Sequence, residues 1–323
     1  MRMEQVPTLD VRAFTEGDAD SQARFVDALG ASLREFGFVT FVGHGVDQAV
    51  TGPAYDALKR FFALSEEAKM RYHIEGGGGA RGYTAFGVES AKDSDEPDLK
   101  EFWHVGREFA EDSPWFGTEL PNVWPGEIEG FQEHTLRLYD TLDALGGKIL
   151  EAIALHLELP RDFFAKVVDH GNSVLRPIHY PPLPKGQTIK GVRAGAHEDI
   201  NLITLLVCSS APGLELLRND GQWLPLGTTE GTIAMNVGDM MQRLTNHELP
   251  STTHRVVNPP EPWASQPRMS VPFFLHPNSE YLIETLPGCI SEANPNRYPE
   301  PITADDYLVE RLREIGLIKE GEG

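Results

Sequence analysis

A short polar segment brings two side chains that can bind a metal close together in the sequence. His197 and Asp199 lie in the run GAHEDIN, residues 195–201, directly before an apolar stretch. Side chains two positions apart in a strand point to the same side, so both can reach one ion while Glu198 points away. His254, in the strand-like run 251–257, is the best candidate for a third ligand.

Two imidazoles and one carboxylate on one face of an ion leave its other positions open. This ligand set is diagnostic of non-haem Fe(II) oxygenases, in which the open positions bind an organic ligand and O₂ together. A closed zinc site with four protein ligands cannot do this. An isolated His-x-Asp pair is weak evidence, however, because a polar turn that leads into a strand explains it as well.

A candidate carboxylate-binding pair follows His254 in the sequence. Arg268 and Ser270 lie at the start of a predicted strand, residues 269–275, and project to the same side. A guanidinium fork and a hydroxyl suit a carboxylate that is held in a buried pocket. A lone arginine at a strand start would be a surface residue, but its position after the metal motif favours binding. On a regular strand the side chain of Phe273 would point to the side opposite Arg268. Pro272 can disturb this alternation of side chains.

Composition and charge limit the partners and the location. The 323 residues are 40% hydrophobic and 24% charged, as in an ordinary globular protein. The formal net charge of -21 disfavours binding to nucleic acid or to an acidic membrane. Cys208 and Cys289 are too few for a disulfide framework, which fits a cytoplasmic protein. Neither a signal peptide nor a run of about 18 apolar residues is evident, so we expect no membrane span.

Helical patterns come first along the chain, and strand patterns follow. Helical spacing of apolar residues marks two segments, namely 25–36 capped by Gly37 and 138–153 ended by Pro160. Another helix is expected over about 55–64, beginning near Pro53. Residues 81–124, rich in glycine, proline and aromatic residues, are predicted to be an irregular excursion whose aromatic side chains need burial. Short β-rich runs lie at 174–180, 202–207, 214–217, 232–237, 253–257 and 269–275.

This order predicts an α+β protein whose core is mostly β, of the sandwich or barrel type. We expect three regions along the chain. Residues 1–171 form a helical and irregular region that packs on the core, residues 172–280 form the core, and residues 281–323 form a C-terminal extension.

Several further motifs occur in a fixed order. The N-terminal part contains FGF at 36–38, GHGV at 43–46, RGY at 81–83 and DLKE at 98–101. The later part contains HYPP at 179–182, GLEL at 213–216, NVGD at 236–239 and STTHRV at 251–256. Together with the metal motif, these pieces resemble the isopenicillin N synthase-like family of iron and 2-oxoglutarate-dependent dioxygenases. The resemblance extends over residues 5–280.

The resemblance implies a double-stranded β-helix, or jelly-roll, with flanking helices. It also implies that His197, Asp199 and His254 bind Fe(II), while Arg268, Ser270 and Tyr180 bind the co-substrate 2-oxoglutarate. Such enzymes use O₂ to convert 2-oxoglutarate to succinate and CO₂ while they oxidise a C–H bond of a small molecule. Hydroxylation, desaturation and cyclisation all remain open. Leu183 replaces a cysteine that is usual in plant members, which weakens plant-type substrate assignments.

The resemblance also suggests where the substrate lies. Arg81, Tyr83, Phe102 and His104 come from the segment that can overhang the mouth of the barrel in relatives, and they are candidates for contact with the substrate. Ordinary packing is the favoured interpretation of these residues, because aromatic residues mostly fill cores.

Two other functions remain open on the sequence alone. Some relatives are Fe(II) oxidases that use O₂ without 2-oxoglutarate, and they carry the same Arg-x-Ser pair. A jelly-roll that binds a small molecule without catalysis is the other alternative, but it has no physical need for all three metal ligands. A nucleic-acid demethylase is disfavoured by the charge of -21 and the lack of a basic cluster. The oligomeric state stays open.

Overall fold

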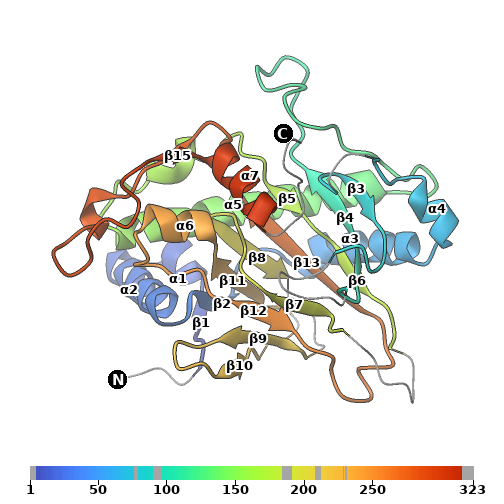
Figure 1. Ribbon diagram of the computed structural model, residues 1–323, viewed down its shortest axis with the longest axis horizontal. Coiled ribbons are helices and arrows are strands. Elements are labelled where there is room, and N and C mark those ends of the chain that lie inside the picture. The colour runs from blue at the N-terminus through green and yellow to red at the C-terminus, as the bar shows by residue number, and fades with distance from the viewer. Residues whose placement is uncertain are drawn as a thin grey trace.

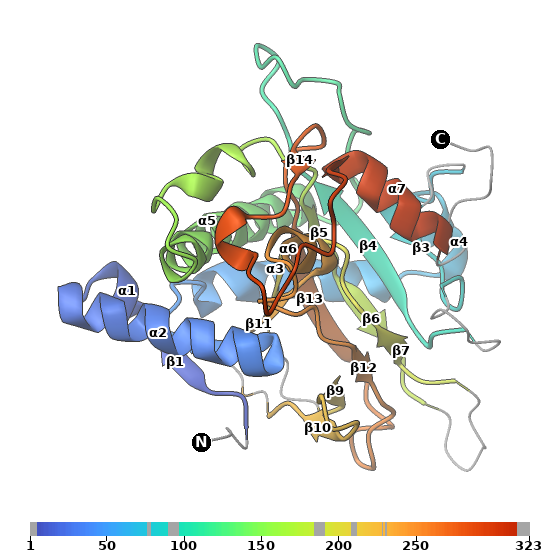
Figure 2. The same ribbon diagram turned by 60° about the vertical axis from the view of Figure 1, so that its left-hand side comes forward.

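The computed structural model describes residues 5–75, 79–89, 97–183, 191–207, 212–227, 229 and 231–314. Two β-sheets pack face to face, and helices cover the outer face of the longer one (Figures 1 and 2). In the described residues, the longer sheet has nine strands in the order β1-β2-β11-β8-β13-β5-β4-β3, and β6 pairs with both β13 and β4. The smaller sheet has the order β10-β9-β12-β7.

The strands of both sheets are short, and β13 is the longest of those described. Those of the longer sheet are β1 (Thr8–Asp10), β2 (Phe38–Val42), β3 (Gly82–Thr84), β4 (Glu101–Gly106), β5 (Val174–Leu175), β6 (Ile178–Tyr180), β8 (Ile203–Val207), β11 (Ile233–Val237) and β13 (Arg268–Leu275). Those of the smaller sheet are β7 (Ala194–His197), β9 (Leu214–Leu217), β10 (Trp223–Pro225) and β12 (His254–Val256). A separate pair consists of β14 (Leu282–Ile283) and β15 (Ile302–Thr303).

The helices confirm the predicted α+β class with a β core. They are α1 (Arg12–Thr15), α2 (Ala19–Phe36), α3 (Gln48–Phe62), α4 (Glu66–Met70), α5 (Phe131–His156), α6 (Asp239–Leu244) and α7 (Ala304–Glu314), with short 3-10 turns η1 (Phe163–Lys166) and η2 (Pro287–Cys289). Among the described residues, no helix is long and apolar enough to cross a membrane. The division of the chain at residues 171 and 280 stays a prediction, although strands β1 to β4 belong to the longer sheet.

The start predicted for the second helix was wrong by several residues. Helix α3 begins at Gln48, because the side chain of Asp47 accepts hydrogen bonds from the backbone N–H groups of Ala49 and Val50. Pro53 therefore lies inside the helix and does not begin it. The predicted start missed the first turn of α3, in which Val50 is buried in the core.

The segment 81–124 is less irregular than predicted. Its strands β3 and β4 pair with each other, and β4 pairs with β5 and β6 of the longer sheet. Phe102 and Trp103 are buried as expected, but Phe86 and Phe116 are 49% and 57% exposed. The polar Glu101 and His104 are buried in β4 and hid its strand pattern in the sequence.

Side chains along β13 point alternately to its two faces. One face packs in the apolar core on the helix side, and the other faces the space between the two sheets, which is called the interior below. Met269, Val271, Phe273 and Leu275 belong to the large helix-side core. Phe273 meets Tyr139 of α5 with ring centroids 4.9 Å apart, which confirms that it points away from the side of Arg268. Arg268, Ser270 and Phe274 therefore face the smaller sheet.

The end of α2 is locked by a glycine that also contacts the segment before β12. Gly37 has φ 64°, the left-handed region, and its carbonyl accepts a hydrogen bond of 2.9 Å from Val237. A Cβ at this position would lie 2.5 Å from the carbonyl oxygen of Pro250 and 2.4 Å from Oγ1 of Thr252. An alanine here is therefore strained and crowded.

We predict that Gly37→Ala lowers the free energy of unfolding by at least about 1–2 kcal/mol, because a side chain disfavours this backbone conformation. Urea denaturation measures the change. Gly147→Ala is the control, since Gly147 lies within α5 and an added Cβ there meets nothing within 4 Å. That variant should be neutral or stabilising, since alanine is the better helix former. Equal destabilisation of the two variants would contradict the prediction.

Candidate functional site

Two strands of the smaller sheet bring the predicted metal ligands together. His197 ends β7 and pairs in register with His254, the first residue of β12, and their rings lie 4.4 Å apart. Oδ1 of Asp199 lies 3.9 Å from Nε2 of each histidine. The three ligand atoms all lie within 4.8 Å of one another, so they form a group that could hold one metal ion.

Backbone carbonyls orient both imidazoles. Nδ1 of His197 lies 2.7 Å from the carbonyl oxygen of Gly195, and Nδ1 of His254 lies 3.1 Å from that of Thr252. Because a carbonyl only accepts, each Nδ1 carries the proton and each Nε2 keeps its lone pair. Both lone pairs are therefore available on the side of Asp199. Asp199 and His254 are buried and His197 is exposed, so the shared point can be reached from outside.

The carboxylate of Asp199 is held ionised and oriented. Its Oδ2 accepts hydrogen bonds from Oγ1 of Thr204 at 2.6 Å and from Nδ2 of Asn236 at 2.7 Å. Burial by itself raises the pKa of Asp199, but the two histidines and these hydrogen bonds outweigh it and keep the pKa below the ordinary value. Oδ1 is left facing the histidines, as a metal ligand must be.

The predicted carboxylate-binding residues also lie together. Arg268 pairs with Tyr180 across β13 and β6, and its Cζ lies 4.9 Å from the centroid of the Tyr180 ring. Nη1 of Arg268 lies 3.4 Å from Oγ of Ser270. The guanidinium is buried, its Nε has no hydrogen bond, and none of the described carboxylates pairs with it. Burying an unpaired cation is costly, so this arrangement fits an anionic ligand.

The four predicted substrate residues fall into two groups. Phe102 packs with Ile178 and Tyr180, and the ring of His104 lies 4.9 Å from that of Phe102, so both face the interior. Tyr83 instead donates to Glu101 at 2.5 Å, on the helix side of the sheet. Arg81 donates to Asn172 at 3.0 Å. The structure therefore brings only two of the four beside the co-substrate residues.

Arg176 is an interior residue that the sequence analysis missed. Its Nε donates to Nε2 of His104, and its Cζ lies 4.7 Å and 5.1 Å from the ring centroids of Phe102 and Phe274. Phe274 pairs in register with Thr204, which binds Asp199, so the guanidinium stands near the metal ligands. The period of two from Tyr180 through Ile178 was a signal that could have found it.

The charges around Arg176 leave it only partly paired. Its Nη1 lies 3.5 Å from Oε1 of Glu89, while Nζ of Lys100 lies 2.8 Å from the other oxygen of that carboxylate. Burial alone raises the pKa of Glu89, but the charges of Arg176 and Lys100 outweigh it and hold the pKa well below the ordinary value. His276 comes directly after β13, and burial, assisted by the charge of Arg176, lowers the pKa of its ring to about 4 although the charge of Asp199 opposes this.

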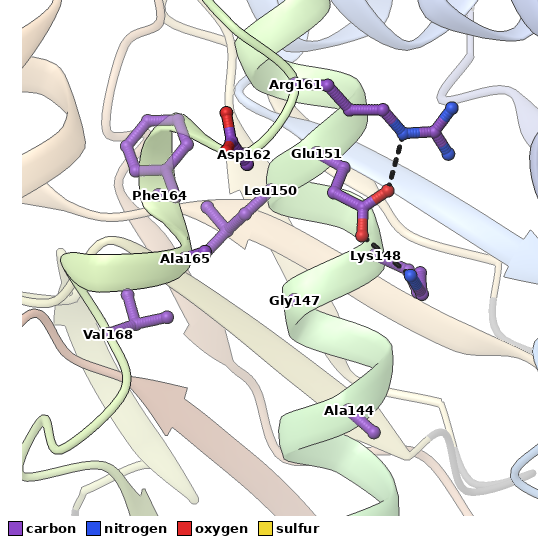
Figure 3. Close-up of a pocket in the computed structure, with 10 residues that line it drawn as sticks. All are labelled: Ala144, Gly147, Lys148, Leu150, Glu151, Arg161, Asp162, Phe164, Ala165 and Val168. Carbon is purple, nitrogen blue, oxygen red and sulfur yellow. Dashed lines mark hydrogen bonds and ion pairs between the residues drawn. The ribbon is translucent and has the colours of Figure 1, made fainter.

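A separate half-open hollow of about 540 Å³ lies between α5 and η1 (Figure 3). Its charged residues neutralise one another, because Glu151 accepts from both Lys148 and Arg161 at 2.7 Å. None of His197, Asp199 and His254 lines it. We therefore place the chemistry at the residues between the two sheets and not in this hollow.

Comparisons with known proteins agree with this geometry. A family model described as "2OG-Fe(II) oxygenase superfamily" matches residues 171–277, and "non-haem dioxygenase in morphine synthesis N-terminal" matches residues 6–127. The 2-oxoglutarate-Fe(II) type oxidoreductase hxnY of Emericella nidulans is 32% identical over 311 residues, which cover 94% of this chain and 88% of that protein.

Solved structures are similar over nearly the whole chain. A 2OG-Fe(II) oxygenase family protein from Caulobacter crescentus has 50% identity and a TM-score of 0.87, covering 96% of this chain and 99% of that one. A full-length protein from Neurospora crassa, solved in complex with alpha-KG and thymine, has 30% identity and a TM-score of 0.84, covering 95% of this chain and 96% of that one.

The chain belongs to the 2OG-Fe(II) oxygenase superfamily. It is an Fe(II)- and 2-oxoglutarate-dependent dioxygenase that oxidises a small molecule, with Fe(II), 2-oxoglutarate and O₂ as its cofactors. The predicted double-stranded β-helix with flanking helices and the predicted family are confirmed. The roles of individual residues stay predictions.

We predict that Thr204→Val weakens metal binding by about 10–100-fold, because Asp199 loses a hydrogen bond that orients it. Titration of the purified protein with Co(II), followed by its visible absorption, measures the affinity. Thr51→Val on α3 is the matched control, since its hydroxyl bonds only the backbone carbonyl of Asp47. An unchanged affinity in Thr204→Val would mean that the remaining bond from Asn236 is sufficient.

Proposed function

We propose that His197, Asp199 and His254 hold Fe(II) in this dioxygenase. The observation that carries the proposal is the meeting of their three ligand atoms within 4.8 Å, with both Nε2 atoms and Oδ1 free of other partners that would block them. We further propose that Arg268, Ser270 and Tyr180 hold the distal carboxylate of 2-oxoglutarate. The buried, unpaired guanidinium of Arg268 supports this role.

The chain's own residues orient the reactants and exclude water. When bound, the metal and 2-oxoglutarate supply the oxidising chemistry, with succinate and CO₂ as products. Thr204 and Asn236 keep Asp199 ionised and fixed in one orientation. Arg268 and Ser270 direct the co-substrate from one end of the interior, while the buried cluster of Phe102, Ile178 and Tyr180 limits the access of water.

The residues near Arg176 suggest what the substrate must offer. A guanidinium clamped between two aromatic rings presents its remaining N–H groups to a carbonyl or carboxylate oxygen. Phe102, Phe274 and His104 provide flat surfaces beside it. The similar Neurospora crassa protein binds thymine and 5-formyluracil, which are flat and carry carbonyl oxygens. We therefore propose a small, flat substrate that carries such an oxygen.

The composition supports a small-molecule partner and a cytoplasmic location. A net charge of -21 favours a small molecule over nucleic acid or an acidic membrane as the partner. Only two cysteines are present, which supports a cytoplasmic location.

We predict that His197→Ala and His254→Ala each abolish iron retention and succinate release, because two protein ligands do not hold the ion. Iron content and succinate formed from 2-oxoglutarate are the measurements. His134→Ala on α5 is the control and should retain both. Wild-type iron content in either variant would remove that histidine from the ligand set. Substrate turnover that does not depend on added 2-oxoglutarate would instead support the oxidase alternative.

We predict that Arg176→Met weakens the stimulation of succinate release by substrate, so that higher substrate concentrations are needed, while slow release without substrate persists. The test uses a panel that includes thymine, 5-formyluracil and flat carboxylic acids, each beside an analogue without the oxygen. The loss of a charged hydrogen bond is worth about 1.5–3 kcal/mol, so the apparent KM should rise at least about ten-fold.

Arg161→Met is the matched control for Arg176→Met. Its guanidinium also lies over a phenylalanine ring, at 4.8 Å from Phe14, and pairs with a carboxylate, but it borders the hollow of Figure 3. It should behave as the wild type. Stimulation by the analogues without the oxygen, or full stimulation in Arg176→Met, would exclude Arg176 as the anchor.

A further inference from the structure

Arg193 is a fully buried cation near the co-substrate residues that lacks a partner of opposite charge. It lies directly before β7 and is 0% exposed. Its Nε and Nη1 make no hydrogen bond, and Nη2 makes two long ones of 3.4 Å to the carbonyl oxygens of Trp263 and Gln266. In the described part of the chain, no carboxylate pairs with it.

Two guanidiniums share one aromatic ring. Cζ of Arg193 lies 5.8 Å and Cζ of Arg268 lies 4.9 Å from the centroid of Tyr180, which is itself buried. Burial and the charge of Arg268 lower the pKa of Arg193 to about 10, so Arg193 stays charged at neutral pH. Two unpaired positive charges around one buried ring repel each other and are stabilised by an anion.

We propose that Arg193 is a second cation of the 2-oxoglutarate pocket. It acts as a positioning residue, which attracts the distal carboxylate toward Arg268 and fixes the Tyr180 ring between the two guanidiniums. This inference rests on the proposed role of Arg268. The competing role is purely structural, in which Arg193 only holds the segment 263–266 through its two carbonyl contacts.

The two roles predict opposite effects on the protein without co-substrate. A positioning cation is unpaired until the carboxylate binds, so its removal relieves repulsion and leaves the melting temperature unchanged or higher. It also reduces the stabilisation that 2-oxoglutarate confers, since an attraction in the bound state is lost. A structural residue lowers the melting temperature when removed, and the gain from 2-oxoglutarate stays the same.

The experiment compares 2-oxoglutarate with 2-oxovalerate, which has a methyl group in place of the distal carboxylate. Isothermal titration calorimetry on the Mn(II)-loaded protein gives Kd for each, and thermal unfolding gives the melting temperatures. Arg193→Met should weaken 2-oxoglutarate binding about ten-fold or more, which is the effect of losing one charge-assisted contact. Its Kd for 2-oxovalerate should not change. Arg193→Lys, which keeps the charge, should recover most of the affinity.

Two further variants serve as the positive and the negative control. Arg268→Met should show the same selectivity for 2-oxoglutarate with a larger loss. Arg107→Met is the matched control, because Cζ of Arg107 lies 5.9 Å from the ring of Tyr139 on the helix side, and it should bind both 2-oxo acids as the wild type does. Arg193→Gln repeats the comparison if Arg193→Met does not fold.

Three outcomes would overturn the inference. Equal weakening of both 2-oxo acids in Arg193→Met would show a general distortion, and a lower melting temperature with unchanged Kd would show the structural role. Failure of both uncharged variants to fold would show the structural role as well. If Arg268→Met left 2-oxoglutarate binding unchanged, the proposed role of Arg268 itself would be wrong. This result differs from the three outcomes above, which concern Arg193 alone.

Discussion

The register of β12 against β7 sets His254 opposite His197, and the catalytic interior depends on this pairing. A shift of one residue would turn His254 to the other face of the sheet, because side chains alternate along a strand. The pairing is fixed on both sides, since β12 also pairs with β9 and the carbonyl of Thr252 orients the His254 ring. Gly37 packs against the same segment from the end of α2.

Asp199 joins the two sheets beside His197 and His254. It follows β7 of the smaller sheet, but its side chain is bound by Thr204 of β8 and Asn236 of β11 in the longer sheet. Its carbonyl also accepts a hydrogen bond of 2.7 Å from Asp239 at the start of α6. These polar contacts join the two sheets around one carboxylate, and an apolar cluster with residues from both sheets also packs between them.

The interior contains arginine side chains that are not fully paired with carboxylates. Such buried cations lower the stability of the fold unless an anionic ligand pairs with them. Arg268 and Arg193 surround Tyr180, and Arg176 stands at the other end against Phe274. The carboxylate of Glu89 near Arg176 shares its charge with Lys100. This division matches the proposed function, in which one end of the interior binds the co-substrate carboxylate and the other end binds the substrate.

The sequence by itself predicted the family, which is confirmed, and the group of His197, Asp199 and His254 that the structure brings together. His197 with Asp199, and Arg268 with Ser270, are pairs whose spacing of two follows a local rule for strands, and apolar periodicity marked the helix that ends at Gly37. It did not reveal β4, whose buried Glu101 and His104 break the apolar pattern. Only the tertiary structure decided that Arg176 meets Phe274, that Arg193 meets Tyr180, and that Tyr83 turns away from the interior. These contacts depend on strand order and register between distant segments, which local spacing does not encode.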